Sequence, residues 1–389
     1  MINAASVLKL YDFFALIQED TMKLKIQKEE IQHALQRIQG IVDKKTTMPI
    51  LSHFLLKVNK TASLMATDLD IALKGPLKAE IKGTGGLCIP ARKLFEIAKE
   101  VEGEIVLEVQ DNNWIKVTSG KSTFKLMGLP EEDFPSLPEV DKSEELSLRA
   151  DALKTMIDKT IYATGESDTR YTLNGLLLHF TPKKKNSEVR VVGTDGHRLS
   201  VISAGIQNNL SEEKKIILPK KAAIELRKLL EGSSDDVSLN INRNHIFFNI
   251  DGTVLTSRLI EGTYPNYEQV IPKNNEKKVT VDRLSLLKAL RRTSIMSRER
   301  TNAVRLDLEP GKITLISMNP DIGEAREEIA AQYKGDQITI GYNARYVMDI
   351  LQAMEGESVI MELQEPLSPT LLQEENNKNY TCVVMPMRT

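Results

Sequence analysis

Residues 24–38, LKIQKEEIQHALQRI, read as a short alternating strand that runs directly into an amphipathic helix. Ile31, Leu35 and Ile38 follow the i, i+4, i+7 spacing of a single buried helix face. The same strand-then-helix pattern returns in 146–157 (LSLRADALKTMI) and 279–290 (VTVDRLSLLKAL), at intervals of roughly 120 to 135 residues. A pattern that recurs at a nearly constant period predicts a repeated architecture.

Two further landmarks recur in each third of the chain, in the same order. A second strand-and-helix unit is found at 88–97 (CIPARKLFEI), 218–226 (LPKKAAIEL) and 340–350 (IGYNARYVMDI). Between the two units lie the pairs Thr67-Asp68, Thr194-Asp195 and Asn319-Pro320. Pro90 and Pro219 suit the first turn of a helix, where the missing N–H costs nothing. Three landmarks in one order favour three copies of one domain over three unrelated domains of equal size.

The segments between these units read as strands and hairpins, with turn residues at 111–113 and 309–312. We therefore predict an α+β fold in which each domain duplicates a unit of antiparallel strands and one helix. The expected helices are 28–39, 90–102, 150–162, 219–231, 282–295 and 343–355. The expected organisation is an extension at 1–21 followed by domains at 22–142, 143–273 and 274–389, with linkers at 135–142 and 271–277.

The composition excludes several classes of protein. The chain has 389 residues, 41% hydrophobic and 27% charged, which rules out collagen and low-complexity disorder. Two cysteines, Cys88 and Cys382, are too few for a disulfide framework and fit a reducing cytoplasm. The apolar stretch 7–17 is interrupted by Lys9 and Asp12 and has no basic residue before it, so it does not read as a signal peptide. We expect a cytoplasmic protein.

No motif predicts catalysis, a metal or a cofactor. Gly120-Lys121-Ser122 resembles the end of a phosphate-binding loop, but Ile115 stands where its first glycine is needed, so a hairpin turn is expected. The five histidines show no metal-ligand spacing. Asp68 and Asp70, two apart on an expected strand, could share a face and hold a cation, although a capping role is more typical. The cluster 195–198 (DGHR) offers acid–base groups without a nucleophile.

The positive charge is concentrated on the expected helices. The chain carries 52 Lys and Arg against 54 Asp and Glu, yet the six helices hold sixteen basic and twelve acidic residues. The excess lies in Lys220, Lys221, Arg227, Lys228, Arg283, Lys288, Arg291 and Arg292. No aromatic residues interleave with them, so stacking on single strands is not indicated. Contact with duplex phosphates, without sequence readout, fits better.

Six short motifs closely resemble those of one family, the bacterial DNA polymerase III beta subunits, or sliding clamps. They are 194–199 (TDGHRL), 264–272 (YPNYEQVIP), 383–388 (VVMPMR), 48–51 (MPIL), 67–70 (TDLD) and 90–93 (PARK). The similarity runs from Met22 to Thr389 in the family's order. It implies a non-enzymatic processivity factor: a head-to-tail homodimer whose six domains form a ring, lined by twelve helices, around duplex DNA. Weak phosphate contacts would let such a ring slide without sequence specificity.

The resemblance also implies a hydrophobic pocket between the middle and last domains that binds peptides of the replicative polymerase catalytic subunit, the clamp loader and other proteins with a clamp-binding motif. The matching residues are Leu173, Thr194, Gly196, His197, Arg198, Leu199, Pro265, Val270, Asn343, Tyr346, Leu367, Val383, Val384, Met385, Pro386, Met387 and Arg388. Met side chains in such a pocket can repack around several related peptides. A buried edge strand at 383–387 is the alternative interpretation.

Further residues are expected to contact DNA or to form the dimer interface. Lys45 and Arg170 match DNA-contacting residues of the family, and charge alone adds Lys220, Lys221, Arg227, Arg283 and Arg291. For the dimer, the match places Ile97, Val101 and Phe124 of the first domain against Ile295 and Met296 of the third, and Lys93 and Lys121 opposite Glu324, Glu327 and Glu328. Complementary charge at the two ends favours head-to-tail closure.

Two other functions remain open on the residues alone. One is a DNA-processing hydrolase that uses Asp68, Asp70 and the cluster 195–198. The other is a monomeric adaptor that binds peptides but not DNA.

Overall fold

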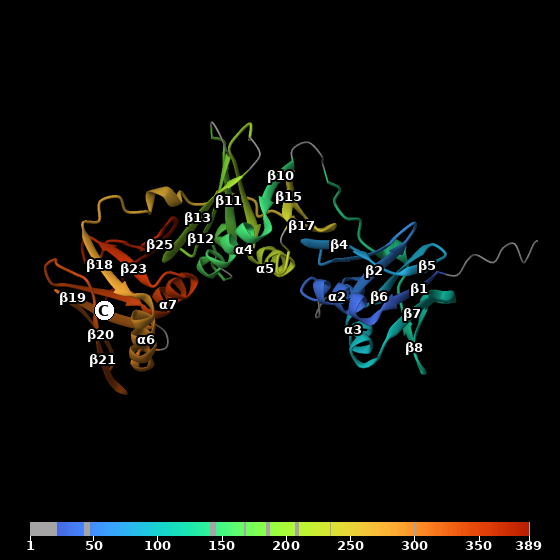
Figure 1. Cartoon of the computed structure of the whole chain (residues 1–389), viewed down its shortest axis with the longest axis horizontal. Helices are drawn as coiled ribbons and strands as arrows, with labels where there is room; N and C mark the ends of the chain where they lie inside the picture. Colours follow the sequence, from blue (N-terminus) through green and yellow to red (C-terminus); the bar gives the residue numbers. More distant parts are fainter. Residues whose placement is uncertain are drawn as a thin grey trace, which may run out of the picture. The chain divides into compact units, whose positions relative to one another are not determined.

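The computed structural model describes residues 22–42, 47–140, 145–166, 169–183, 187–206, 210–233, 235–298 and 301–388. The chain divides into two compact units, which are described separately. Unit 1 comprises 1–145 and 235–258, and unit 2 comprises 146–234 and 259–389. Figure 1 shows the helices and strands in chain order, from blue at the N-terminal side to red at β25.

Unit 1 contains two antiparallel sheets and two helices in its described residues. One sheet has the order β5-β1-β7-β8-β9 and the other includes β15-β16-β17-β4-β3-β2-β6. The first sheet's strands are β1 (Lys23–Gln27), β5 (Glu80–Lys82), β7 (Glu104–Val109), β8 (Trp114–Ser119) and β9 (Ser122–Met127). The second sheet's are β2 (His53–Val58), β3 (Ala62–Thr67), β4 (Ile71–Leu77), β6 (Gly85–Pro90), β15 (Asp236–Ile241), β16 (His245–Ile250) and β17 (Thr253–Arg258). Helices α2 (Lys28–Ile38) and α3 (Ala91–Glu100) contact each other.

Unit 2 repeats this arrangement with β14-β11-β12-β13-β25-β24-β23-β18 in one sheet and β21-β20-β19-β22 in the other. Its strands are β11 (Gly175–Thr181), β12 (Ser187–Thr194), β13 (Arg198–Ile206), β14 (Lys214–Pro219), β18 (Lys277–Asp282), β19 (Ala303–Glu309), β20 (Lys312–Asn319), β21 (Gly323–Ala330), β22 (Ile338–Asn343), β23 (Ser358–Leu363), β24 (Thr370–Glu374) and β25 (Asn377–Val384). The helices are α4 (Ala150–Asp158), α5 (Lys220–Leu229), α6 (Arg283–Thr293) and α7 (Ala344–Ala353). Strand β10 (Glu145–Arg149) leads into α4.

The six predicted helices are confirmed, and each directly follows a strand. In α2 the residues Ile31, Leu35 and Ile38 form the buried face, as their spacing predicts. The prolines were misplaced by one residue, because Pro90 and Pro219 end strands and cap the following helices rather than starting them. Their φ values of −58° and −54° are compatible with that extended cap position.

The predicted hairpins are also confirmed. Strands β7 and β8 pair across 111–113, and β19 and β20 pair across Glu309 and Lys312. Gly120 and Lys121 form the turn between β8 and β9, so the apparent phosphate-loop motif is a hairpin.

Strand pairing crosses the predicted domain boundaries. Strand β17, expected in the middle domain, pairs antiparallel with β4 of the first, from Val254↔Lys74 to Ser257↔Ile71. Strand β25 pairs in the same way with β13, and β24 flanks its other side. The alternative of an edge strand is therefore wrong as far as Val384, because β25 is an interior strand.

The Thr-Asp landmark is a repeated turn. In unit 1 the Asp68 carboxylate accepts hydrogen bonds from the backbone N–H groups of Asp70 (3.0 Å) and Ile71 (2.7 Å). Thr67 Oγ1 accepts from the Leu69 N–H (3.0 Å) and donates to the Ile71 carbonyl (2.9 Å). The expectation that Asp68 and Asp70 lie on a strand is wrong, since β3 ends at Thr67 and β4 begins at Ile71. Asp68 has the capping role.

Unit 2 contains the same turn. Asp195 Oδ1 accepts from the N–H groups of His197 (2.9 Å) and Arg198 (3.0 Å), and Thr194 repeats both bonds of Thr67. Leu69, with φ of 81°, stands where unit 2 has Gly196 with φ of 84°. In the third copy Asn319 Oδ1 accepts from the Asp321 N–H (3.1 Å). The landmark therefore recurs because its side chains close a tight turn.

A buried ion pair lies beneath the sheet of unit 2. The Lys159 ammonium lies 3.6 Å from Glu374 Oε2, and both side chains are about 95% buried, with exposures of 4% and 5%. Glu374 Oε1 accepts hydrogen bonds from the backbone N–H groups of Glu355 and Gly356. Burial alone would raise the pKa of Glu374, but these backbone donors, Asn377 and Lys159 lower it below its usual value.

We predict that Asp68→Ala destabilises unit 1 by about 1–2 kcal/mol, because two backbone N–H groups lose their acceptor. Asp68→Asn keeps the acceptor and should recover most of this loss. Asp70→Ala is the matched control and should change the free energy of unfolding by less than about 0.5 kcal/mol. Urea unfolding followed by the fluorescence of Trp114, the single tryptophan and a residue of unit 1, measures all three. Equal effects of Asp68→Ala and Asp70→Ala would contradict the capping role.

We predict an acid-dependent loss of stability that Glu374→Gln suppresses. Because the folded-state pKa of Glu374 lies below its ordinary value of 4.5, its contribution is fully present above about pH 4.5 and is lost as the pH falls through the lower folded-state value. The neutral amide should reduce the slope of unfolding free energy against pH in that range. The exposed neighbour Glu375→Gln is the control and should leave the slope unchanged. Unfolding monitored by circular dichroism at a series of pH values gives the slopes.

Candidate functional site

The side chain of Arg198 organises one end of the unit 2 sheet. It is 10% exposed, and its guanidinium donates to Asp195 Oδ2 (3.0 Å), Asp349 Oδ2 (2.6 Å) and the Tyr162 carbonyl (2.6 Å). Burial would lower the pKa of Arg198, but the two carboxylates raise it. Arg198 is therefore a fixed positive charge, and the cluster 195–198 is a structural arrangement rather than an acid–base centre.

An aromatic side chain of α7 covers this arrangement. Tyr346 lies with its ring centroid 4.6 Å from the Arg198 guanidinium carbon, and the exposed His197 ring stacks on it at 6.1 Å between centroids and 17° between planes. Asn343 positions the start of α7, since its Oδ1 accepts from the Arg345 N–H (2.9 Å). Four predicted residues, His197, Arg198, Asn343 and Tyr346, thus meet at the N-terminus of α7.

A small apolar cavity of about 110 Å³ lies beside Arg198. Four segments wall it: the 3₁₀ turn 171–173, the β12–β13 turn, the segment 265–270 and the end of β25. The lining residues are Arg170, Leu173, Thr194, Gly196, Arg198, Leu199, Pro265, Tyr267, Val270, Val383 and Met385. Beneath it Leu173, Leu199 and Val383 belong to one buried cluster with Tyr264 and Tyr267. Apolar side chains of a partner would fit this cavity.

Gly196 allows the wall of the cavity to close. A Cβ added at Gly196 would lie 2.7 Å from Arg170 Nη1, and the φ of +84° already disfavours other residues. Arg170 Nη2 donates to the Asp195 carbonyl (3.0 Å). Arg170, predicted as a DNA contact, therefore lines this cavity.

The structure brings most of the predicted pocket residues together, with exceptions. The C-terminal segment is held by hydrogen bonds from the Met385 N–H to the His197 carbonyl (2.8 Å) and from the Met387 N–H to the Gly341 carbonyl (2.9 Å). Val384 is buried within β25, and Pro386 is half-buried. Leu367 is 57% exposed and Arg388 is exposed; neither lines the cavity. The sequence analysis missed Tyr267, although it falls inside the motif 264–272.

The predicted DNA-contacting residues differ in what they contact. Lys45 lies outside the described residues. Lys220 pairs with Glu166 (2.9 Å), and Arg227 pairs with Asp158. Arg283 donates to the carbonyls of Gly356 (2.7 Å) and Leu351 (3.0 Å). Lys221 and Arg291 are exposed on α5 and α6.

The predicted dimer residues lie near the edges of two sheets. In unit 1, β9 is an edge strand that carries Phe124, with Lys121 in the turn before it; Ile97 is half-buried and Val101 is buried. In unit 2, β21 is an edge strand that carries Glu324, Glu327 and Glu328. Ile295, which lies beside β21, is 73% exposed. Met318 (62%) and Ile322 (61%) are exposed to a similar degree, although the sequence did not predict them as dimer residues. Within the chain Lys93 pairs with Glu96, Glu327 with Arg292 and Glu328 with Lys312.

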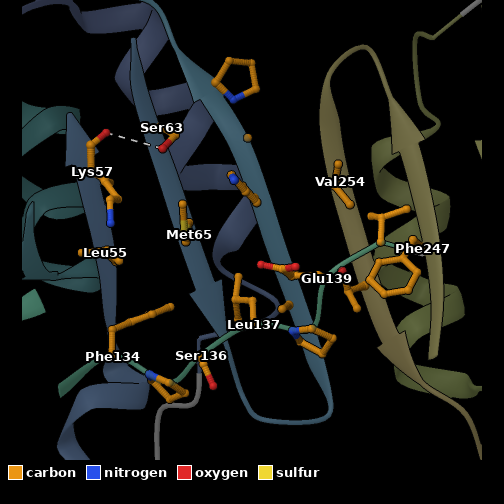
Figure 2. A pocket seen from close by; sticks show the side chains of 18 of the residues that line it. Leu55, Lys57, Ser63, Met65, Phe134, Ser136, Leu137, Glu139, Phe247 and Val254 are labelled. Atoms are coloured by element: carbon orange, nitrogen blue, oxygen red, sulfur yellow. Dashed lines mark hydrogen bonds between the residues drawn. The ribbon is translucent and has the colours of Figure 1, made fainter. Parts of the chain in front are cut away.

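A cavity of about 630 Å³ in unit 1 contains none of these predicted residues. Figure 2 shows Leu55 and Met65 on its strands, Phe134 and Leu137 on the segment that crosses it, and Val254 opposite. Among the described residues no group of three or more His, Cys, Asp or Glu side chains could hold a metal ion. No helix in the described ranges is long and apolar enough to cross a membrane.

Comparison with known proteins gives one consistent result. Family models match three consecutive segments: the DNA polymerase III beta subunit N-terminal domain at 22–138, its central domain at 147–266 and its C-terminal domain at 268–388. The beta sliding clamp of Pseudomonas putida is 36% identical over 370 residues, covering 94% of this chain and 100% of the relative. That of Escherichia coli is 33% identical over 371 residues, with the same coverage.

Solved structures agree. A Pseudomonas aeruginosa sliding clamp bound to griselimycin superposes with a TM-score of 0.91 at 34% identity, covering 95% of this chain and 100% of that one. The DNA polymerase sliding clamp from Bacillus subtilis gives a TM-score of 0.90 at 28% identity with the same coverage.

Proposed function

Because the chain belongs to the DNA polymerase III beta subunit family, the sliding clamps, we propose that two copies close head to tail into a ring around duplex DNA. Membership makes the protein a non-catalytic processivity factor of DNA polymerase III. A cytoplasmic location and three domains at 22–142, 143–273 and 274–389 complete the proposal. The turn that recurs at Asp68, Asp195 and Asn319 supports this threefold division.

The observation that carries the ring is that two of the edge strands, β9 and β21, bear predicted dimer residues. An edge strand exposes backbone donors and acceptors that another strand can pair with. Beside β21 the apolar side chains of Ile295, Met318 and Ile322 are each more than 60% exposed. A cluster of exposed apolar side chains is typical of a surface that another protein covers. Lys121 adjoins one edge and Glu324 lies on the other, so opposite charges meet if the edges pair in a head-to-tail dimer.

DNA is the proposed occupant of the ring, held by topology and by weak contacts. Lys220 and Arg227 are each paired with an acidic neighbour, so a phosphate must compete with an existing partner. Such competition lowers affinity and permits sliding without sequence preference. Lys221 and Arg291, which are exposed on α5 and α6, and Lys45 are the other proposed contacts.

The cavity beside Arg198 is the proposed peptide site. Its partners would be the replicative polymerase catalytic subunit, the clamp loader and other proteins with a clamp-binding motif. The support is chemical: a small apolar cavity is bordered by Arg170, Arg198 and the stacked His197 and Tyr346, which orient a peptide with polar ends. Met385 contributes a side chain that adapts to related ligands.

We predict that the protein, placed on nicked circular DNA by a clamp loader, remains on the circle and is lost when the circle is cut. A closed ring is held on DNA by topology and slides off the ends of the linear product. A protein that binds DNA directly remains bound when the salt concentration is unchanged. Ile295→Asp should prevent ring closure and abolish retention on the circle, because it places a charge at an apolar contact. Gel filtration before and after cutting measures the bound fraction. Retention on the linear product would contradict the ring.

We predict that removal of residues 385–389 abolishes binding of a fluorescent polymerase peptide and leaves the dimer intact. The truncation removes the Met385 wall of the cavity but leaves β25 complete to Val384. Met48→Ala, a change of a half-exposed methionine in unit 1, is the control and should bind normally. Fluorescence anisotropy gives the affinity and sedimentation gives the mass. Unchanged peptide affinity in the truncated chain would refute the assignment of the site.

A further inference from the structure

Tyr267 separates the peptide cavity from two other cavities of unit 2. It begins the 3₁₀ turn Tyr267–Gln269 and is only 4% exposed. Its side chain lines the 110 Å³ cavity, a second cavity of about 420 Å³ and a third of about 470 Å³. Tyr267 therefore borders unfilled volume on one part of its surface and packs into the buried cluster on another, so polar contacts add to packing in fixing its position.

A hydrogen bond at the Tyr267 hydroxyl helps to fix the position of the Tyr267 ring. His179 Nδ1 lies 2.9 Å from this hydroxyl, and the two rings meet edge to face at 6.1 Å and 79°. Arg190, which donates to Glu188 and Glu268 (2.8 Å each), contributes a nearby positive charge. Burial raises the pKa of Tyr267 and outweighs the positive charge of Arg190, so its hydroxyl keeps its proton near neutral pH and can donate it.

The direction of each bond follows from the chemistry of the groups. His179 is 5% exposed, and its Nε2 lies 2.6 Å from Glu213 Oε1. A carboxylate only accepts, so Nε2–H donates to Glu213. In the tautomer that carries only this ring hydrogen, Nδ1 accepts from the tyrosine O–H. Tyr267, His179 and Glu213 thus form one chain of donors and acceptors.

The sheet holds His179 firmly in place. It lies on β11, with Arg190 of β12 opposite it on one side and Lys215 of β14 on the other. Lys215 in turn pairs with Glu213 (2.8 Å). His179 does not line the 110 Å³ cavity, so any influence on a bound peptide must pass through Tyr267.

We propose that His179 is a positioning residue for the peptide site: through the bond from the Tyr267 hydroxyl to its Nδ1, it keeps the Tyr267 ring as a wall of the peptide cavity. The inference rests on the proposed peptide-binding function and adds a residue to it. Loss of the acceptor lets the ring turn toward the neighbouring cavities, and the peptide must then restore its position on binding.

The test compares three replacements of His179 that differ in which ring nitrogen they imitate. Phenylalanine keeps the ring and removes both polar atoms. Asparagine places its amide oxygen near the position of Nδ1 and can accept from Tyr267, whereas glutamine places its amide nitrogen near Nε2 and can only serve Glu213. We expect His179→Phe and His179→Gln to weaken binding of the polymerase peptide about three- to tenfold, the effect of one lost hydrogen bond. His179→Asn should recover most of the affinity.

A second comparison isolates the bond itself. Tyr267→Phe removes the hydroxyl and should weaken the peptide as much as His179→Phe does. The double variant should be no weaker than either single one, because both changes remove the same bond. Thermal unfolding of each variant gives its stability. The comparison shows whether peptide affinity changes with stability or with the presence of a hydrogen-bond acceptor at the position of Nδ1.

The outcomes separate the two proposals. Equal affinity of the wild-type chain and His179→Phe, or affinities that follow unfolding temperature without rescue by asparagine, would overturn the positioning role alone. Failure of the wild-type chain to bind the peptide, with the truncation at Val384 behaving identically, would overturn the peptide site and this inference with it.

Discussion

Antiparallel pairing between strands from neighbouring repeats is the interaction on which the rest of the molecule depends. β17 completes the sheet that contains β4, and β25 completes the sheet that contains β13. The middle and last repeats therefore each supply strands to a sheet that begins in the repeat before them. Strands β9 and β21 are among the edge strands that remain. In the proposed ring, β9 of one copy pairs with β21 of the other.

The peptide cavity follows from the same pairing. Arg198 pairs with Val384, and Leu199 with Val383, so the end of β25 lies against the β12–β13 turn. The equivalent turn of unit 1 has Leu69 where unit 2 has Gly196. A Cβ at Gly196 would lie 2.7 Å from Arg170 Nη1, so the guanidinium would have to shift from its present position beside the Asp195 carbonyl. The two copies of one turn thus differ in the space that they leave for a neighbouring side chain.

Local patterns in the sequence predicted the helices and hairpins because periodicity and turn composition are local properties. They failed where the outcome depended on distant partners. Asp68 and Asp70 have the spacing of one strand face, but the Asp68 carboxylate closes a turn with backbone groups instead. Residues 235–258 belong to the middle repeat in sequence, yet β17 pairs with β4 of the first, and no local pattern in the sequence predicts that pairing. Tyr267 was missed for a similar reason: its role comes from His179, 88 residues away.

The ion pairs explain how a chain of near-zero net charge can carry basic helices. The chain has a net charge of −2, and its basic helices keep acidic neighbours within reach, as Lys220 does with Glu166. Exposed pairs of this kind are worth about 0–1 kcal/mol each, so a phosphate can replace the acid and be replaced again at little cost. A surface that bound phosphates tightly would hold a ring at one place on DNA. A closed ring stays on DNA without binding it tightly. A near-neutral charge therefore allows such a ring to slide along the DNA.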